Sequence, residues 1–289
     1  MINNTYPIKL EHSLEYARLV TYIQEDVPGS MIKKRPLVLV CPGGGYSYTS
    51  AREAEVVALR FLAMGCHAAV LYYSCAPAVF PASLLELAYS VKLLRANAGE
   101  WHIHPDKMIV LGFSAGGHLA ASLGMFWNRE FVWKGLGLKE EERELLRPNG
   151  MILGYPVITS GEFAHKGSFC QILGLDKDPE PETFDLQGKV YSVDEMMQML
   201  SLENQVTKDT PKAFIWHTFE DGGVPMENSL FLVGAMRKQE IPVEYHLFPR
   251  GPHGLSLANE ETSESLDSAA YVKECQIWIE LAKAWIANL

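Results

Sequence analysis

Short apolar runs alternate along the chain with segments whose apolar residues recur at helical spacing. Uninterrupted apolar runs, such as residues 37–40, are typical of strands buried on both faces of a parallel sheet. The predicted central strands are residues 36–41, 66–73, 107–111, 150–155, 213–217 and 243–248. The predicted helices are residues 51–64, 82–98, 226–238 and 268–288. This alternation predicts an α/β fold with a mostly parallel central sheet and helices on both faces.

A serine near the middle of the chain lies in a pattern typical of a nucleophile. The run Gly112-Phe113-Ser114-Ala115-Gly116 follows a predicted strand and precedes a segment of helical spacing. This Gly-x-Ser-x-Gly pattern places a serine hydroxyl on a sharp turn between strand and helix, clear of the backbone. Gly112 and Gly116 lack a Cβ atom, which lets the strand and the helix close around that turn. We therefore predict Ser114 as a nucleophile, with a glycine-rich packing turn as the alternative.

A histidine should assist this serine if it belongs to a catalytic triad, and it should lie late in the chain. His253 follows the predicted strand 243–248, in a loop where open α/β sheets place their sites. His246 lies inside that strand and is predicted to be an ordinary strand residue. We predict His253 as the general base, against a loop histidine without a role.

The acid of such a triad should follow the preceding strand, residues 213–217. Two acids, Glu220 and Asp221, stand in the loop after it. Asp221 precedes a Gly-Gly turn, which suits a short carboxylate that reaches an imidazole, whereas Glu220 is predicted to face solvent. Asp221 would accept the imidazole N–H and fix its tautomer. The alternative is an aspartate that satisfies its own turn.

Three consecutive glycines follow the first predicted central strand, in Cys41-Pro42-Gly43-Gly44-Gly45-Tyr46. Their backbone N–H groups are unshielded, which suits donors to an oxyanion beside the N–H of Ala115. A phosphate-binding loop is the rival interpretation, but no Gly-Lys-Ser/Thr follows the glycines. The glycine run is therefore predicted to supply a second oxyanion donor beside Ala115.

These four stretches together resemble the α/β-hydrolase superfamily, in particular the esterase branch of acetyl xylan esterases and related carbohydrate and feruloyl esterases. The matching stretches are residues 41–46, 111–120, 221–230 and 247–254. The resemblance implies Ser114 as nucleophile, Asp221 as orienting acid and His253 as base, and it adds Gly44, Gly45 and Ala115 as oxyanion donors. The triad chemistry requires no metal and no organic cofactor. Pro42 stands where the lipase-like branch has a histidine before its glycines, which favours the carbohydrate-esterase branch.

Two segments depart from the regular alternation. Residues 8–26 alternate loosely and predict one or two outer antiparallel strands within 14–24, followed by a turn at 26–30. Residues 160–210 exceed an ordinary connection and carry short helical patches between turns rich in Pro and Asp. We expect one α/β-hydrolase domain over residues 1–289, with 160–210 as a small cap over the active site. A surface excursion without substrate contact is the alternative.

Composition restricts the partners and the location. The net charge is −10 and no basic cluster is present, which argues against nucleic-acid binding. The N-terminus lacks a basic stretch followed by an apolar one, and no apolar run approaches about 18 residues, so we expect neither a signal peptide nor a membrane span. Five cysteines without paired spacing favour a reducing cytoplasm, although a chain cloned without its leader would have the same pattern.

Several other features are given structural interpretations. Trp101-His102-Ile103-His104 has no nearby carboxylate cluster and is not predicted to bind a metal. His118, in the first turn after the serine, is predicted to be packed or hydrogen-bonded. The acidic run 139–144 is predicted to be the solvated face of a helix.

The predicted activity is hydrolysis of a carboxylic ester through an acyl-enzyme. The resemblance favours removal of a short acyl group, acetyl first, from a sugar or xylo-oligosaccharide. A serine peptidase of the oligopeptidase-like kind is one alternative, although the chain lacks room for the propeller domain of those enzymes. A non-catalytic binding protein on a hydrolase scaffold is the other. The sequence leaves open whether the chain forms a homo-oligomer.

Overall fold

The central feature of the fold is an eight-stranded sheet in the order β1-β2-β4-β3-β5-β6-β9-β10. The computed structural model describes residues 1–25, 28–29 and 31–289. The strands of the sheet are β1 (Ile2–Pro7), β2 (Arg18–Ile23), β3 (Arg35–Cys41), β4 (His67–Tyr72), β5 (Ile103–Phe113), β6 (Gly150–Gly154), β9 (Ala213–Thr218) and β10 (Val243–Phe248). β2 pairs antiparallel with β1 and β4, and all other neighbours pair in parallel.

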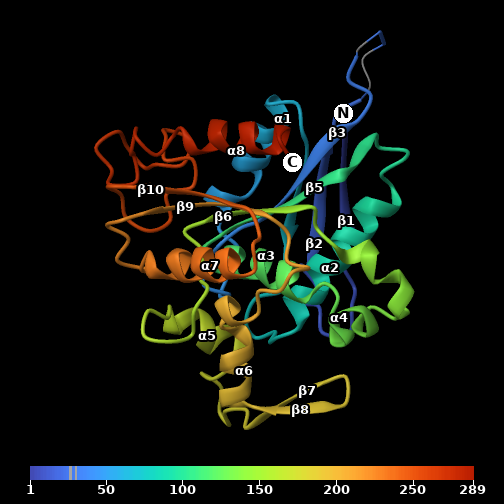
Figure 1. Cartoon of the computed structure of the whole chain (residues 1–289), viewed down its shortest axis with the longest axis vertical. Coiled ribbons are helices and arrows are strands. Elements are labelled where there is room, and N and C mark those ends of the chain that lie inside the picture. Colours follow the sequence, from blue (N-terminus) through green and yellow to red (C-terminus); the bar gives the residue numbers. More distant parts are fainter. Residues whose placement is uncertain (26–27, 30) are drawn as a thin grey trace.

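Helices cover both faces of this sheet (Figure 1). One face carries α2 (Ala82–Ala96), α3 (Ser114–Phe126) and α7 (Glu227–Lys238). The other face carries α1 (Glu55–Ala63) and α8 (Trp278–Ala287). The central strands are apolar because side chains on both of their faces are removed from water by a helical layer. The predicted α/β fold with a mostly parallel sheet is confirmed.

The N-terminal edge of the sheet differs from the prediction. β2 lies within the predicted outer strands, but β1 precedes them and was not expected. Its sequence, Ile2-Asn3-Asn4-Thr5-Tyr6-Pro7, is mostly polar and exposed, so no apolar alternation marks it. The predicted turn at residues 26–30 falls on residues 26, 27 and 30, which lie outside the described residues.

Two predicted helices have different bounds in the structure. The helix expected at 51–64 is divided into a 3-10 turn, η1 (Ala51–Glu53), and α1, because Ala54 has non-helical dihedral angles. The helix expected at 268–288 begins only at Trp278. The preceding residues form turns, and the Val272 amide donates to the Ala258 carbonyl across a loop instead of along a helix (3.1 Å). Ile277, directly before α8, is 53% exposed.

The segment 160–210 contains two helices and a hairpin. Its elements are α5 (Lys166–Leu173), β7 (Thr183–Leu186), β8 (Lys189–Ser192), α6 (Val193–Leu200) and η3 (Leu202–Asn204). The predicted helical patches correspond to α5 and α6, whereas the β7–β8 hairpin was not predicted. Figure 1 shows α6 and this hairpin projecting from one end of the molecule. The remaining short helices are α4 (Glu130–Gly135) and η2 (Glu140–Leu146), the latter over the acidic run.

The two faces of α1 differ in burial, and this difference predicts how substitutions on each face affect stability. Phe61 is fully buried and its ring lies 6.3 Å from that of Trp278, whereas Leu59 on the same helix is 42% exposed. We expect Phe61→Ala to lower the free energy of unfolding by about 3–5 kcal/mol, because it leaves a cavity between helix and sheet. Leu59→Ala should change it by less than about 0.5 kcal/mol. Urea denaturation measures both, and equal losses would contradict the assigned packing of α1.

Candidate active site

The serine turn joins β5 directly to α3. Ser114 has a φ of +53°, in the left-handed region, and its exposure is only 7%. A Cβ atom added at Gly112 would lie 2.0 Å from the Gly116 carbonyl oxygen. One added at Gly116 would lie 2.1 Å from the Cys41 carbonyl oxygen. Only glycine fits at these two positions, and their close backbone contacts force the strained turn that presents the serine hydroxyl.

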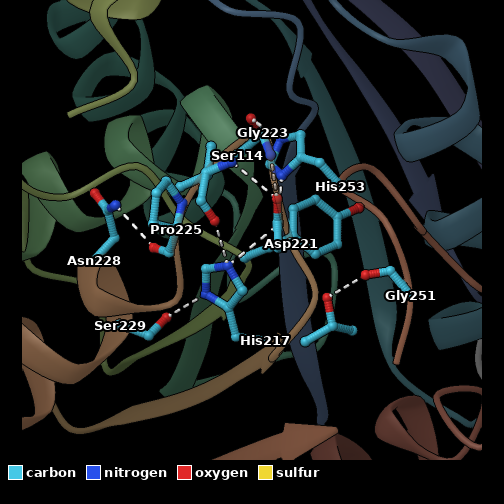
Figure 2. Close-up of polar contacts among 12 residues, drawn as sticks. Ser114, His217, Asp221, Gly223, Pro225, Asn228, Ser229, Gly251 and His253 are labelled. Atoms are coloured by element: carbon cyan, nitrogen blue, oxygen red, sulfur yellow. Dashed lines mark hydrogen bonds and ion pairs between the residues drawn. The ribbon is translucent and has the colours of Figure 1, made fainter. Parts of the chain in front are cut away.

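The structure brings the three residues predicted from the sequence into direct contact (Figure 2). The His253 Nε2 atom lies 2.7 Å from Ser114 Oγ. The His253 Nδ1 atom lies 2.7 Å from Asp221 Oδ2. Ser114 comes from the end of β5, Asp221 from the loop after β9, and His253 from the loop after β10. The three meet because parallel strands end at the same edge of the sheet.

Asp221 is a buried carboxylate with four hydrogen-bond donors. Besides His253, the backbone N–H groups of Gly223 and Val224 donate to its Oδ1 atom, each at 2.9 Å, and His217 Nε2 lies 3.2 Å from Oδ2. Burial raises the pKa of Asp221, but the hydrogen bonds from His217 and His253 outweigh it and hold the pKa well below its usual range. The carboxylate is therefore charged and acts only as an acceptor.

His217 is a second histidine on Asp221 that the sequence analysis missed. Its Nε2 atom faces two acceptors, Asp221 Oδ2 and the Val224 carbonyl oxygen at 2.9 Å, so it carries a proton. Its Nδ1 atom lies 2.8 Å from the Ser229 hydroxyl (Figure 2). His217 thereby helps to hold the Asp221 carboxylate in place. The neighbours of His217 set the tautomer of its ring. The only sequence signal was its place at the end of the strand before the acid.

The glycine loop, residues 42–50, lies against the serine turn. The Gly43 N–H donates to the Glu53 carboxylate (2.9 Å). Gly44 and Gly45 have φ values of +127° and +64°, which favour glycine, and their N–H groups make no hydrogen bond among the described residues. Ala115 lies in the first turn of α3, where N–H groups lack intrahelical acceptors. The amides of Gly44 and Gly45, and that of Ala115 at the start of α3, thus have no acceptor among the described residues, as the predicted role of oxyanion donors requires.

His165 is a further histidine near this loop, and the sequence analysis did not single it out. A Cβ atom added at Gly45 would lie 4.0 Å from His165 Cε1. The Nδ1 atom accepts from the Ser168 N–H (3.2 Å) at the start of α5, so the proton is on Nε2. Burial lowers the pKa of His165, the proximity of His253 lowers it further and Asp221 raises it in part, so the ring is neutral at neutral pH. In the described structure Nε2 remains available as a donor.

The other histidines of the sequence analysis lie in ordinary surroundings. His246 Nε2 lies 2.8 Å from Glu244 Oε1 on β10. His118 is buried, with Nδ1 2.8 Å from the Tyr46 hydroxyl and Nε2 2.9 Å from the Leu200 carbonyl oxygen, as predicted for a packed residue.

Within residues 1–25, 28–29 and 31–289, no group of three or more His, Cys, Asp or Glu side chains could hold a metal. In the same residues, every helix is too short or too polar to span a membrane.

The sequence pattern of one protein family matches residues 24–236, most of the chain, and the family is described as BD-FAE. The chain belongs to the BD-FAE family. Endo-1,4-beta-xylanase B of Butyrivibrio fibrisolvens is 34% identical over 83% of this BD-FAE chain. The acetylxylan esterase of Xylanibacter ruminicola is 28% identical over 82% of it. The chain covers 36% and 43% of these two relatives, so it spans less than half the length of either.

Solved structures agree with this membership. The acetyl ester-xyloside bifunctional hydrolase of Caldicellulosiruptor lactoaceticus is 33% identical, with a TM-score of 0.75 over 94% of this chain and 88% of that one. The carboxylesterase Cest-2923 of Lactobacillus plantarum WCFS1 is 26% identical, with a TM-score of 0.79 over 100% of this chain and 98% of that one. The BD-FAE chain therefore has the α/β-hydrolase fold, and the resemblance stated from its motifs is confirmed.

The hydrogen bonds of Asp221 predict a large effect of removing its charge. We expect Asp221→Asn to fold and to lose kcat on 4-nitrophenyl acetate by about 10⁴-fold, because an amide cannot hold His253 in the same tautomer. The control is Glu220→Gln, its exposed neighbour, which should retain wild-type kcat. Steady-state kinetics of both purified variants measures the two values of kcat. Similar small losses in the two would mean that Asp221 does not orient His253.

Proposed function

We propose that this BD-FAE chain is a serine esterase with Ser114, His253 and Asp221 as its catalytic triad. The observation that carries the proposal is the continuous contact Asp221–His253–Ser114 beside backbone amides that have no acceptor in the described part of the chain. The esterase names of its relatives support the same activity. The neutral form of His253 donates from Nδ1 to Asp221, which leaves Nε2 as the acceptor for the serine proton.

The reaction begins with attack of Ser114 Oγ on the ester carbonyl carbon. His253 Nε2 takes the serine proton as the C–O bond forms, because a neutral serine is a weak nucleophile. Asp221 stabilises the resulting imidazolium. The carbonyl oxygen becomes an oxyanion, which the amides of Gly44, Gly45 and Ala115 stabilise. Each such donor is worth about 3–4 kcal/mol of transition-state free energy.

The second half returns the enzyme to its starting state. The imidazolium gives its proton to the leaving alkoxide, and the acyl group stays on Ser114. A water molecule then attacks the acyl carbon while His253 Nε2 accepts its proton. Collapse of this second oxyanion releases the acid, and the proton on His253 returns to Ser114 Oγ.

The substrate that we propose is a short acyl ester, acetyl first, of a sugar or xylo-oligosaccharide. The names of two relatives, an acetylxylan esterase and an acetyl ester-xyloside hydrolase, support this choice. The net charge of −10 suits a neutral saccharide better than an acidic polymer.

We further propose one domain with 160–210 as a cap, since His165 at the start of α5 lies beside Gly45. We also propose a cytoplasmic location, because all five cysteines are free.

An acyl-length series tests the activity and the nucleophile together. We expect kcat/KM to be highest for 4-nitrophenyl acetate, lower for the butyrate and lowest for the octanoate. Ser114→Ala should lose kcat by about 10⁶-fold on all three. Ser122→Ala, a buried serine of the same helix, is the matched control and should retain activity. Acetate release from acetylated xylo-oligosaccharides, measured with the same variants, tests the sugar.

The outcomes separate the candidate functions. Wild-type rates in Ser114→Ala would refute the triad. Preference for the octanoate would refute the short acyl group. No turnover together with fluorophosphonate labelling of Ser114 would indicate a peptidase or an untested ester. No turnover with an unlabelled Ser114 would indicate a binding protein.

A further inference from the structure

A second buried carboxylate, Glu53, lies next to the proposed active site and takes no part in the triad. It ends η1, directly after the glycine loop, and its exposure is 4%. Its Oε2 atom accepts from the Gly43 N–H (2.9 Å). Its Oε1 atom accepts from the Tyr155 hydroxyl (2.6 Å). One carboxylate thus holds both the glycine loop and a residue at the end of β6.

Tyr155 connects this carboxylate to the histidine loop, residues 249–258. The Ser256 N–H donates to the Tyr155 hydroxyl oxygen (2.8 Å). The Tyr155 ring packs edge-on against the imidazole of His253, with ring centroids 5.0 Å apart. Tyr155 is buried and has a φ of +37°, a strained value for a bulky residue. Backbone strain of this kind persists where surrounding contacts hold it.

A second hydrogen bond joins the same two segments. The Ser256 hydroxyl donates to the carbonyl oxygen of Arg52, which precedes Glu53 in η1 (2.5 Å). The histidine loop is therefore tied to η1 both directly and through Tyr155. Gly43 lies against the nucleophile, since an added Cβ atom would be 3.0 Å from Ser114 Cβ. The connected groups thus reach Ser114 through Gly43 of the glycine loop and through His253 of the histidine loop.

The hydrogen bonds of Glu53 fit the ionised form of its carboxyl group. The Tyr155 oxygen accepts from Ser256, so its own proton points to Glu53 Oε1. Both carboxylate oxygens are then acceptors, as in the ionised form. Burial raises the pKa of Glu53, whereas the hydrogen bonds from Tyr155 and Gly43 lower it. The charges of His253 and Arg52 also lower it, but burial dominates and leaves the pKa of Glu53 above its usual value.

We propose that Glu53 and Tyr155 are positioning residues that hold the glycine loop and the histidine loop in fixed positions relative to Ser114. This inference rests on the proposed esterase function. Because Glu53 binds the Gly43 amide, the loop is held with the next two amides free for the oxyanion. Because Tyr155 holds Ser256, the His253 imidazole keeps its place between Asp221 and the serine. When it is ionised, Glu53 adds its charge to that of Asp221 in stabilising the imidazolium, while neutral His165 adds no charge.

The test uses two conservative variants, their combination and a matched control. Glu53→Gln keeps an acceptor for Gly43 but removes the charge and the acceptor for Tyr155. Tyr155→Phe keeps the ring against His253 but removes the hydroxyl. The control is Glu86→Gln, another buried glutamate, which accepts from the Ser74 N–H (2.7 Å) on the α2 side of the sheet. Assays run well below each melting temperature, with active sites counted by the fluorophosphonate probe.

We expect kcat on 4-nitrophenyl acetate to fall about 10²-fold in Glu53→Gln and in Tyr155→Phe, with KM little changed, because misplaced groups mainly cost transition-state stabilisation. The double variant should be no slower than the slower single one, since the two act as one unit. In Glu53→Gln the acid limb of the kcat/KM profile should move to lower pH, because a negative charge that favours protonated His253 is gone. Glu86→Gln should lower the melting temperature but change neither kcat nor the acid limb.

Wild-type kcat in Tyr155→Phe and Glu53→Gln, with an inactive Ser114→Ala, would overturn this inference and leave the esterase function intact. Strictly additive losses with an unmoved acid limb would also overturn it. Full activity in Ser114→Ala would instead overturn the proposed function. If Glu53→Gln does not fold, Tyr155→Phe decides alone, because it keeps the aromatic packing.

Discussion

The close backbone contact between the serine turn and the end of β3 is the constraint on which the site depends. Gly112 and Gly116 leave no space for a side chain, so β5, α3 and the Cys41 carbonyl meet at van der Waals distance. This contact places the strained Ser114 beside the glycine loop. Because β9 and β10 run parallel to β5 and end at the same edge, their following loops bring Asp221 and His253 to it.

Two buried carboxylates then define the electrostatics around His253. Asp221 receives four hydrogen bonds, which outweigh its desolvation and lower its pKa. Glu53 receives two, and its pKa stays raised because burial dominates. The difference follows from the number of donors available to each. Both are held by backbone amides of the loops that they organise, so charge placement and loop geometry are parts of one arrangement.

Local patterns were enough to predict the central strands and the residues Ser114, Asp221 and His253, because each stands at a turn that directly follows an apolar strand. The fold places these three side chains in contact. The same patterns were wrong at the start of α8, where the Val272 N–H donates to the Ala258 carbonyl oxygen across a loop. They also missed the polar edge strand β1, whose exposed side chains carry no apolar alternation.

The sequence alone determined the order of the central strands and of the helices between them, and the turns that carry the proposed catalytic side chains, since these depend on residues close together in the chain. Only the tertiary structure decided the partners of those side chains. Glu53 meets Tyr155 across 102 positions, and Tyr155 meets Ser256 across 101. No local periodicity encodes such pairs. They form because the parallel sheet brings distant loops to one edge and removes them from water, where unpaired polar groups are costly.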